Sequence, residues 1–125
     1  MAYLLDSNLL TYSADAAHAF LRPLVQSPAN CVYVSAVSQV EALGFHRLVL
    51  ADKFYLESMF ALLGVLPVSQ PIIERATVLH QQQRMTLGDA LIAATALEFG
   101  LAVATRNIRD FTPIVGLSVY NPFAS

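Results

Sequence analysis

The chain has 125 residues, enough for one domain with its own hydrophobic core and too few for two. Apolar residues make up 56% of it, but none of its apolar runs reaches the roughly 18 to 20 residues that a membrane span requires. Charged residues make up 13% and the net charge is −2, so the chain has no overall basic field that would hold nucleic acid without specificity. Any nucleic-acid partner must therefore be bound through local contacts.

The apolar share is more than a small domain can hide, which predicts that a second copy or a partner chain covers part of the surface. We therefore expect at least a dimer. Cys31 is the only cysteine, so there is no disulfide framework, and its place in an apolar strand pattern predicts a buried side chain rather than a nucleophile. The first residues lack a basic segment and reach Asp6 too early for a signal peptide, so we expect a cytoplasmic protein.

Strand and helix patterns alternate in the first half of the chain. A short apolar run predicts a buried strand that ends in a polar turn, with Asp6 at its carboxyl end. Ser13 and Ser35 are typical helix caps, and Pro23 should kink or split the first of the two helices that they open. In chain order, the patterns predict a strand at 3–5, a helix from 13 to about 26, a strand at 31–34, a helix from 35 to 48, a break at 51–53 and a helix from 54 to 63.

The second half continues the alternation. Pro67 favours an edge position for the strand that contains it. Thr86 followed three residues later by Asp89 has the spacing of a capping box, and Gly100 is a typical helix stop. The run after this glycine has no polar alternation, which indicates a strand covered on both faces. The predicted elements are a strand at 65–68, a helix at 69–84, a helix at 86–99, a strand at 101–105 and a strand at 117–120.

Strands that alternate with helices imply right-handed crossovers and a parallel sheet covered on both faces. Asp6 and Asp110 then follow strands at the same edge of the sheet, where ligands bind in open α/β folds. Asp89 begins the helix that leads into the second of these strands, and Glu41 shares a helix face with apolar neighbours. Each carboxylate also has a purely structural interpretation, as a cap of a helix or turn or as a half-exposed side chain at the edge of an apolar stripe.

Carboxylates that meet in one cleft repel each other, by roughly 4 kcal/mol for a pair about 4 Å apart at an effective dielectric constant of about 20. Such a cluster survives by raising its pKa values or by holding a hard cation, and an all-oxygen Asp/Glu site suits Mg²⁺ or Mn²⁺. A metal held in this way can clamp a phosphate and activate water. If the carboxylates meet, the predicted chemistry is phosphoryl transfer.

Four separated blocks carry a resemblance to a known family. They are LLDSN at Asp6, VSQVEAL at Glu41, LGDALIAATAL at Asp89 and ATRNIRDF at Asp110, with VYNP near the end of the chain. In this order they resemble PIN-domain ribonucleases and, more narrowly, the VapC-type toxins of bacterial toxin–antitoxin pairs. The match spans nearly the whole chain, and four blocks in the right order are far more specific than any one acidic residue. Ser7 stands where the family often has threonine, which keeps the hydroxyl group.

The resemblance implies a single PIN domain over residues 1–125, with a three-layer α/β/α fold and a central, mostly parallel sheet of four to five strands. It implies a hydrolase, a metal-dependent endoribonuclease, in which an acidic quartet binds Mg²⁺ or Mn²⁺ and Glu41 helps to bind the metal or orients the attacking water. This quartet is Asp6, Glu41, Asp89 and Asp110. The substrate-binding residues expected beside it are Asn8, Thr105, Arg106, Asn107 and Arg109.

The implied partners are single-stranded or looped RNA, a small antitoxin and a second copy in a homodimer, with DNA contacted only through the antitoxin and no membrane. We expect an amphipathic antitoxin helix to lie in a groove on the apolar helical hairpin between Val40 and Leu63, with an adjoining segment reaching the acidic cleft. The expected anchors are Phe45, Leu48, Val49, Phe54, Tyr55, Met59 and Phe60. Alternatively, these side chains pack only on the sheet or on a second copy.

Two other functions compete with this one. Asp6-Ser-Asn-Leu-Leu-Thr11 is similar to the DxDxT motif of haloacid-dehalogenase-like phosphatases, in which Asp6 would be the nucleophile, but Asn8 replaces the second aspartate. These enzymes also need a lysine near the phosphate, and Lys53 lies in the helical hairpin. The other alternative is a catalytically silent PIN-like module that binds protein, or a receiver-like phospho-acceptor. A melting temperature that rises with Mn²⁺ would favour the nuclease.

Overall fold

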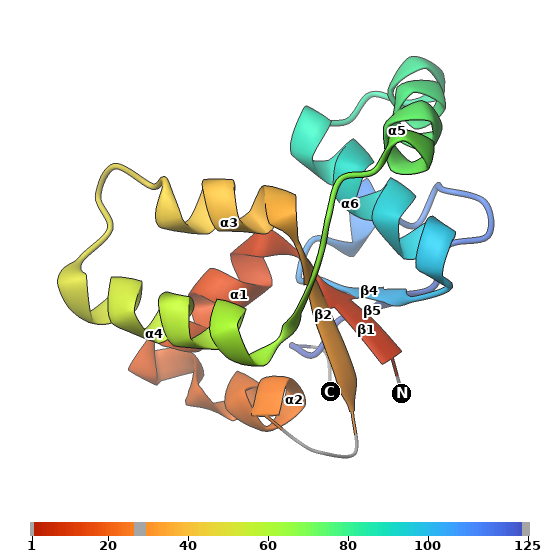
Figure 1. Cartoon of the computed structure of the whole chain (residues 1–125). Helices are drawn as coiled ribbons and strands as arrows, with labels where there is room; N and C mark the ends of the chain where they lie inside the picture. The colour runs from red at the N-terminus through yellow and green to blue at the C-terminus, as the bar shows by residue number, and fades with distance from the viewer. Residues whose placement is uncertain (1, 27–29, 124–125) are drawn as a thin grey trace.

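The computed structural model describes residues 2–26 and 30–123, which form a sheet between two layers of helices (Figure 1). The sheet has five strands in the order β3-β2-β1-β4-β5, and all four pairings are parallel. The predicted three-layer fold with a mostly parallel sheet is therefore confirmed. The strands are β1 (Ala2–Leu5), β2 (Cys31–Ser35), β3 (Gly64–Leu66), β4 (Ala102–Ala104) and β5 (Val119–Tyr120).

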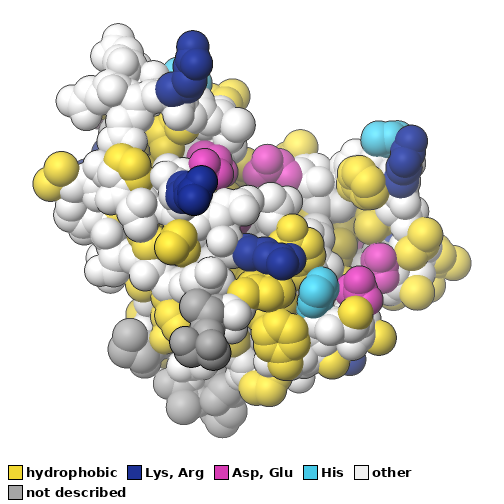
Figure 2. All heavy atoms as spheres, turned by 180° about the vertical axis from the view of Figure 1, so that it is seen from behind, with side chains coloured by type: hydrophobic (Ala, Val, Ile, Leu, Met, Phe, Trp, Pro, Cys, Tyr) yellow, Lys and Arg dark blue, Asp and Glu magenta, His cyan; other side chains and the backbone are white. Residues whose placement is uncertain are grey.

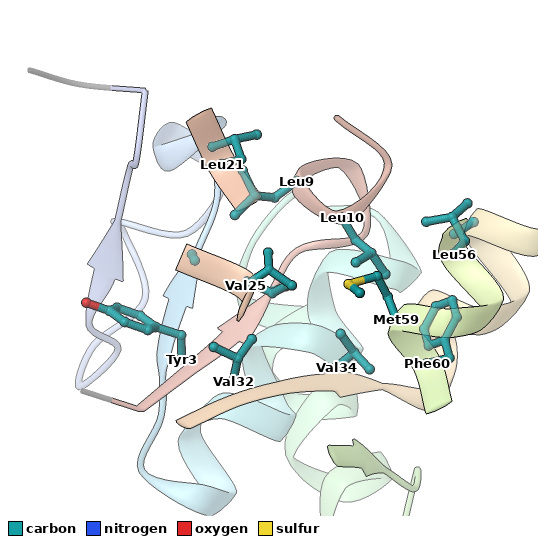
Figure 3. Packing of buried hydrophobic residues seen from close by; sticks show 13 residues of the cluster. Tyr3, Leu9, Leu10, Leu21, Val25, Val32, Val34, Leu56, Met59 and Phe60 are labelled. Atoms are coloured by element: carbon teal, nitrogen blue, oxygen red, sulfur yellow. The ribbon is translucent and has the colours of Figure 1, made fainter. Parts of the chain in front are cut away.

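The helices divide between the two faces of the sheet. Tyr3 and Leu5 point into one core, while Leu4 between them points into the other, because side chains alternate along a strand. Figure 3 shows the first core, in which β1 and β2 pack against α1, α2 and α4. The second core lies under α5 and α6. The helical elements are α1 (Ser7–Ala14), η1 (Ala16–Leu21), α2 (Arg22–Gln26), α3 (Ala36–Leu43), α4 (Leu50–Leu62), α5 (Gln70–Gln82), α6 (Leu87–Phe99) and η2 (Ile108–Asp110).

Helix α6 has the start and stop that its sequence predicts. The Thr86 hydroxyl accepts a hydrogen bond from the backbone N–H of Asp89 at 3.1 Å, which caps the first turn. At the other end Gly100 adopts φ 67°, a left-handed conformation that costs glycine little. Between them a row of fully buried alanines lets the helix lie close to the sheet. The start of α6 is thereby fixed beside the carboxyl ends of the strands.

The predicted start of the first helix is wrong. Helix α1 begins at Ser7, directly after Asp6 in the N-cap position, and no polar turn intervenes. Ser13 is a buried residue near the end of this helix, where its hydroxyl donates to the Leu10 carbonyl at 2.6 Å. Asp15 instead caps η1 through the backbone N–H of Ala17. The direct passage from strand to helix holds the Asp6 carboxylate at the sheet edge.

The predicted hairpin boundaries are also wrong. Helix α3 ends at Leu43, because Gly44 follows as its C-cap, and α4 begins at Leu50.

Cys31 is exposed, not buried, since it opens β2 at a position that the helices leave uncovered. Strand β3 lies at the sheet edge, as Pro67 suggested. No helix in the described part of the chain is long and apolar enough to span a bilayer.

Candidate active site

Four carboxylates line one cavity at the carboxyl edge of the sheet. Asp6 follows β1, Glu41 lies in α3, Asp89 lies in the first turn of α6, and Asp110 ends η2 after β4. Segments far apart in the sequence thus bring together the acidic residues that sequence analysis singled out. The cavity has a volume of about 320 Å³, and its lining is completed by Ser7, Asn8, Thr86, Gly88 and Asn107.

Asp6 is the most buried of the four, with 4% of its surface exposed. The Thr105 hydroxyl donates a hydrogen bond to its Oδ2 at 2.8 Å, which fixes the carboxylate in the cavity wall. Burial raises the pKa of Asp6, and the charge of Glu41 raises it further, while the hydrogen bonds from Thr105 and from the backbone N–H groups of Asn8 and Ser7 oppose this rise. The Thr105 hydroxyl therefore stabilises the charged form of Asp6.

The pKa of Asp89 lies well above its ordinary value. Burial and the negative charges of Asp6, Asp110 and Glu41 raise the pKa of Asp89 to about 6, although the Thr86 hydroxyl lowers it in part. Three other carboxylates thus act on Asp89 electrostatically. The predicted helix-capping geometry is present as well, since the backbone N–H of Asp89 is bonded to Thr86. Capping and membership of the acidic cavity are compatible, because the cap uses the backbone N–H of Asp89 while its carboxylate lines the cavity.

Glu41 is exposed, but neighbouring hydroxyl groups hold its carboxylate. The Ser7 hydroxyl donates to Glu41 Oε1 at 2.8 Å and lies 2.8 Å from the Ser38 hydroxyl. Because Ser7 has one hydroxyl proton, which goes to Glu41, Ser38 must donate to Ser7. Gly88 is also required for this arrangement, since a Cβ there would lie 2.8 Å from Glu41 Oε2. Sequence analysis missed the roles of Ser38 and Gly88, and the only signals were their positions near Glu41 and Asp89.

The predicted polar residues divide into two groups. Asn8 and Asn107 line the acidic cavity, and Thr105 supports it through Asp6 and through a 3.0 Å hydrogen bond from the backbone N–H of Asn107. Arg106 and Arg109 both line a neighbouring cavity of about 330 Å³, which shares Asn107 and Asp110 with the acidic one. Arg106 lies outside the acidic cavity, with its guanidinium group over aromatic rings.

The donor set of the acidic cavity fits a hard cation. The described residues that line it offer carboxylate, hydroxyl and amide oxygens and include no Lys, Arg or His to compensate the negative charge. Such oxygen ligands suit Mg²⁺ or Mn²⁺. Within residues 2–26 and 30–123 no three Asp, Glu, His or Cys side chains are arranged to hold one ion. A cation held by three or more of these carboxylates would therefore require side-chain rotation in this cavity.

Comparisons with known proteins agree with this fold. Residues 3–113 match the family model of the PIN domain, and no curated protein sequence matches the chain. A toxin–antitoxin complex from Klebsiella pneumoniae has a chain 27% identical to this one, with a TM-score of 0.76 and coverage of 98% of this chain and 99% of that chain. FitAcB from Neisseria gonorrhoeae has a chain with 25% identity, a TM-score of 0.77 and the same coverages. VapBC-1 from nontypeable Haemophilus influenzae gives 21% identity and a TM-score of 0.76, over 97% of this chain and 98% of that chain. Because the family model covers most of the sequence, the chain belongs to the PIN domain family.

Proposed function

We propose that the chain acts as a single PIN domain that hydrolyses RNA internally with Mg²⁺ or Mn²⁺, as the toxin of a toxin–antitoxin pair. The observation that carries this proposal is the cavity lined by Asp6, Glu41, Asp89 and Asp110 without a basic side chain among its described lining residues. The similarity over nearly the full length to chains of toxin–antitoxin complexes supports the biological role.

In this proposal the four carboxylates hold the divalent cation, which when bound would clamp the phosphate and activate water. The chain's own groups are suited to positioning. Glu41, oriented by Ser7, can accept a proton from the attacking water. The side-chain amides of Asn8 and Asn107 are exposed at the cavity and can donate hydrogen bonds to phosphate or ribose oxygens.

Arg109 supports the grip on RNA from beside the cavity. It is exposed and lines the neighbouring cavity with Asn107 and Asp110, so its guanidinium group can reach a flanking phosphate. The net charge of the chain is −2, which leaves RNA binding to such local contacts. We propose that affinity for RNA depends more on Arg109 than on distant basic residues.

A groove beside the acidic cavity suits the proposed antitoxin. It has a volume of about 310 Å³, lies between α1, α3 and α4, and shares Asn8 and Glu41 with the acidic cavity. Phe45, which lines it, is 52% exposed. A segment bound in this groove can therefore continue into the acidic cavity and cover it. Two further expectations stay predictions: that the antitoxin contacts DNA, and that the chain forms a homodimer.

The predicted anchors of this groove need correction. Of the seven predicted anchors, Phe45 and Leu48 line the groove. Val49 and Phe54 are exposed but do not line it, and Tyr55 is half-buried against the core. Met59 and Phe60 are 4% and 8% exposed and belong to the core below the helices. They can stabilise the fold and cannot be anchors for a partner. The apolar surface offered by the hairpin is therefore smaller than its sequence suggests.

The decisive experiment is cleavage of single-stranded RNA by the purified chain. We expect cleavage with Mn²⁺, none with EDTA, and none by Asp89→Asn in either condition. Intact RNA after incubation of the wild type with Mn²⁺ would overturn the proposal and leave a protein-binding module. The phosphatase alternative is weakened by Lys53, which is exposed on α4 and is not among the residues that line the acidic cavity.

A further inference from the structure

Next to the acidic cavity, a group of aromatic rings lies under one arginine. We call it the aromatic platform and define it as Tyr12, His18, Phe20, Arg106 and Phe123. The Arg106 Cζ atom lies 4.4 Å from the centre of the Phe123 ring and 5.6 Å from that of Tyr12. The His18 ring lies 5.4 Å from Tyr12, 5.5 Å from Phe123 and 6.1 Å from Phe20, in edge-to-face contacts. On the face drawn in Figure 2, a basic side chain lies across hydrophobic ones with a histidine beside them.

The platform presents π surface and positive charge to solvent. Phe20 is 56% exposed, and Arg106 is exposed as well. Within residues 2–26 and 30–123 the only ion pair joins Arg75 and Glu98, so Arg106 has no carboxylate partner there. Its guanidinium group is instead ordered by the rings of Tyr12 and Phe123. Because Arg106 is exposed and no carboxylate among the described residues pairs with it, a ligand can contact its guanidinium group.

The position of the platform relates it to the acidic cavity. Arg106 follows Thr105, whose hydroxyl group is bonded to Asp6, and precedes Asn107, which lines the cavity. Tyr12 belongs to α1, the helix that begins directly after Asp6. A strand of RNA with one phosphate at the acidic cavity can therefore place a neighbouring nucleotide on the platform.

We propose that the aromatic platform binds an unpaired nucleobase next to the phosphate that is cleaved. This inference rests on the proposed ribonuclease function and deepens it by naming the recognised feature. Nucleobases stack on aromatic rings and on guanidinium groups through their flat faces, which every base offers. In a duplex these faces are covered by the neighbouring base pairs. The platform therefore favours single-stranded over paired RNA without selecting one base.

The test compares RNA with and without bases at equal charge. We would measure fluorescence anisotropy in EDTA, where no metal-dependent cleavage occurs, with a labelled single-stranded RNA of about 12 nucleotides. The second probe has the same length and abasic central nucleotides. We expect the wild type to prefer the normal RNA and Phe20→Ala to weaken its binding about 5- to 150-fold, the range for loss of one stacked base. Arg106→Lys, which keeps the charge but not the planar group, should also reduce this preference.

A matched control separates stacking from general loss of an aromatic residue. Phe99, at the end of α6, is 51% exposed, and Phe99→Ala should change neither affinity. If Phe20→Ala fails to fold, Phe20→Leu keeps an apolar side chain without a π face and should show the same loss. Equal wild-type affinity for both RNAs, or unchanged binding in the folded Phe20 variants, overturns the platform. If the wild type nevertheless cleaves RNA with Mn²⁺, the ribonuclease proposal survives; if it cleaves none, both proposals fail.

Discussion

Replacing Asp89 by asparagine should stabilise the metal-free protein at neutral pH. Burial and the charges of Asp6 and Asp110 raise the pKa of Asp89 from 3.8 to about 6. In the unfolded chain this carboxyl group titrates near its ordinary value, so the folded state binds the proton more tightly. The resulting stabilisation is complete below the unfolded pKa and is lost as the pH rises through the folded pKa of about 6. Above that pH the ionised carboxylate opposes folding.

The size of the effect follows from the shift in pKa. A change of about two units corresponds to about 3 kcal/mol, and partial exposure of Asp89 to water reduces this to about 1 to 2 kcal/mol. The amide also loses the attraction of a charge to the helix N-terminus, which is about 0.3 to 1 kcal/mol. We therefore expect Asp89→Asn to gain about 1 kcal/mol near neutral pH, or about 3 to 5 °C in Tm for a chain of this size.

Thermal unfolding followed by circular dichroism in EDTA measures this difference from acidic to neutral pH. The gain should shrink towards acidic pH, where the wild-type carboxyl group is protonated in the folded state. Glu74→Gln, which removes an exposed carboxylate of α5 that does not line the acidic cavity, should show no such gain. With Mn²⁺ the order should reverse, because only the wild type keeps the full ligand set. A lower Tm of Asp89→Asn than of the wild type, in EDTA at neutral pH, would refute the reasoning.

Three further substitutions test other parts of the site. Gly88→Ala should lower metal-dependent RNA cleavage at least about tenfold with the fold retained, because the new methyl group would displace the Glu41 carboxylate; wild-type turnover would contradict this. Thr105→Val removes the hydrogen bond that lowers the pKa of Asp6, so the acidic limb of the pH–rate profile should move to higher pH. An unmoved limb would show that Asp6 does not control it. Phe54→Glu, at an exposed position of α4, should weaken co-purification with the proposed antitoxin while cleavage persists.

The sequence alone determined the features that depend on local patterns. The capped start and glycine stop of α6 involve only neighbouring residues, such as Thr86 and Gly100, so their physics is readable along the chain. The alternation of strands and helices implied a parallel sheet, and residues that follow parallel strands must lie at one edge. For this reason Asp6 and Asp110 could be assigned to a common site before their side chains were placed.

Only the tertiary structure decided which side chains support that site. The hydrogen bonds from Ser38 through Ser7 to Glu41 join α3 to α1, and no local pattern encodes a contact between helices that are separated by a strand. The same holds for Arg106. Its place in a run of polar residues predicted a contact with phosphate, whereas the fold places its guanidinium group over the Phe123 ring. Burial likewise depends on what covers a residue, so Phe60 belongs to the core while Phe54, on the same helix, faces solvent. Local propensity selects the elements, but packing between distant elements determines the orientation and surroundings of each functional group.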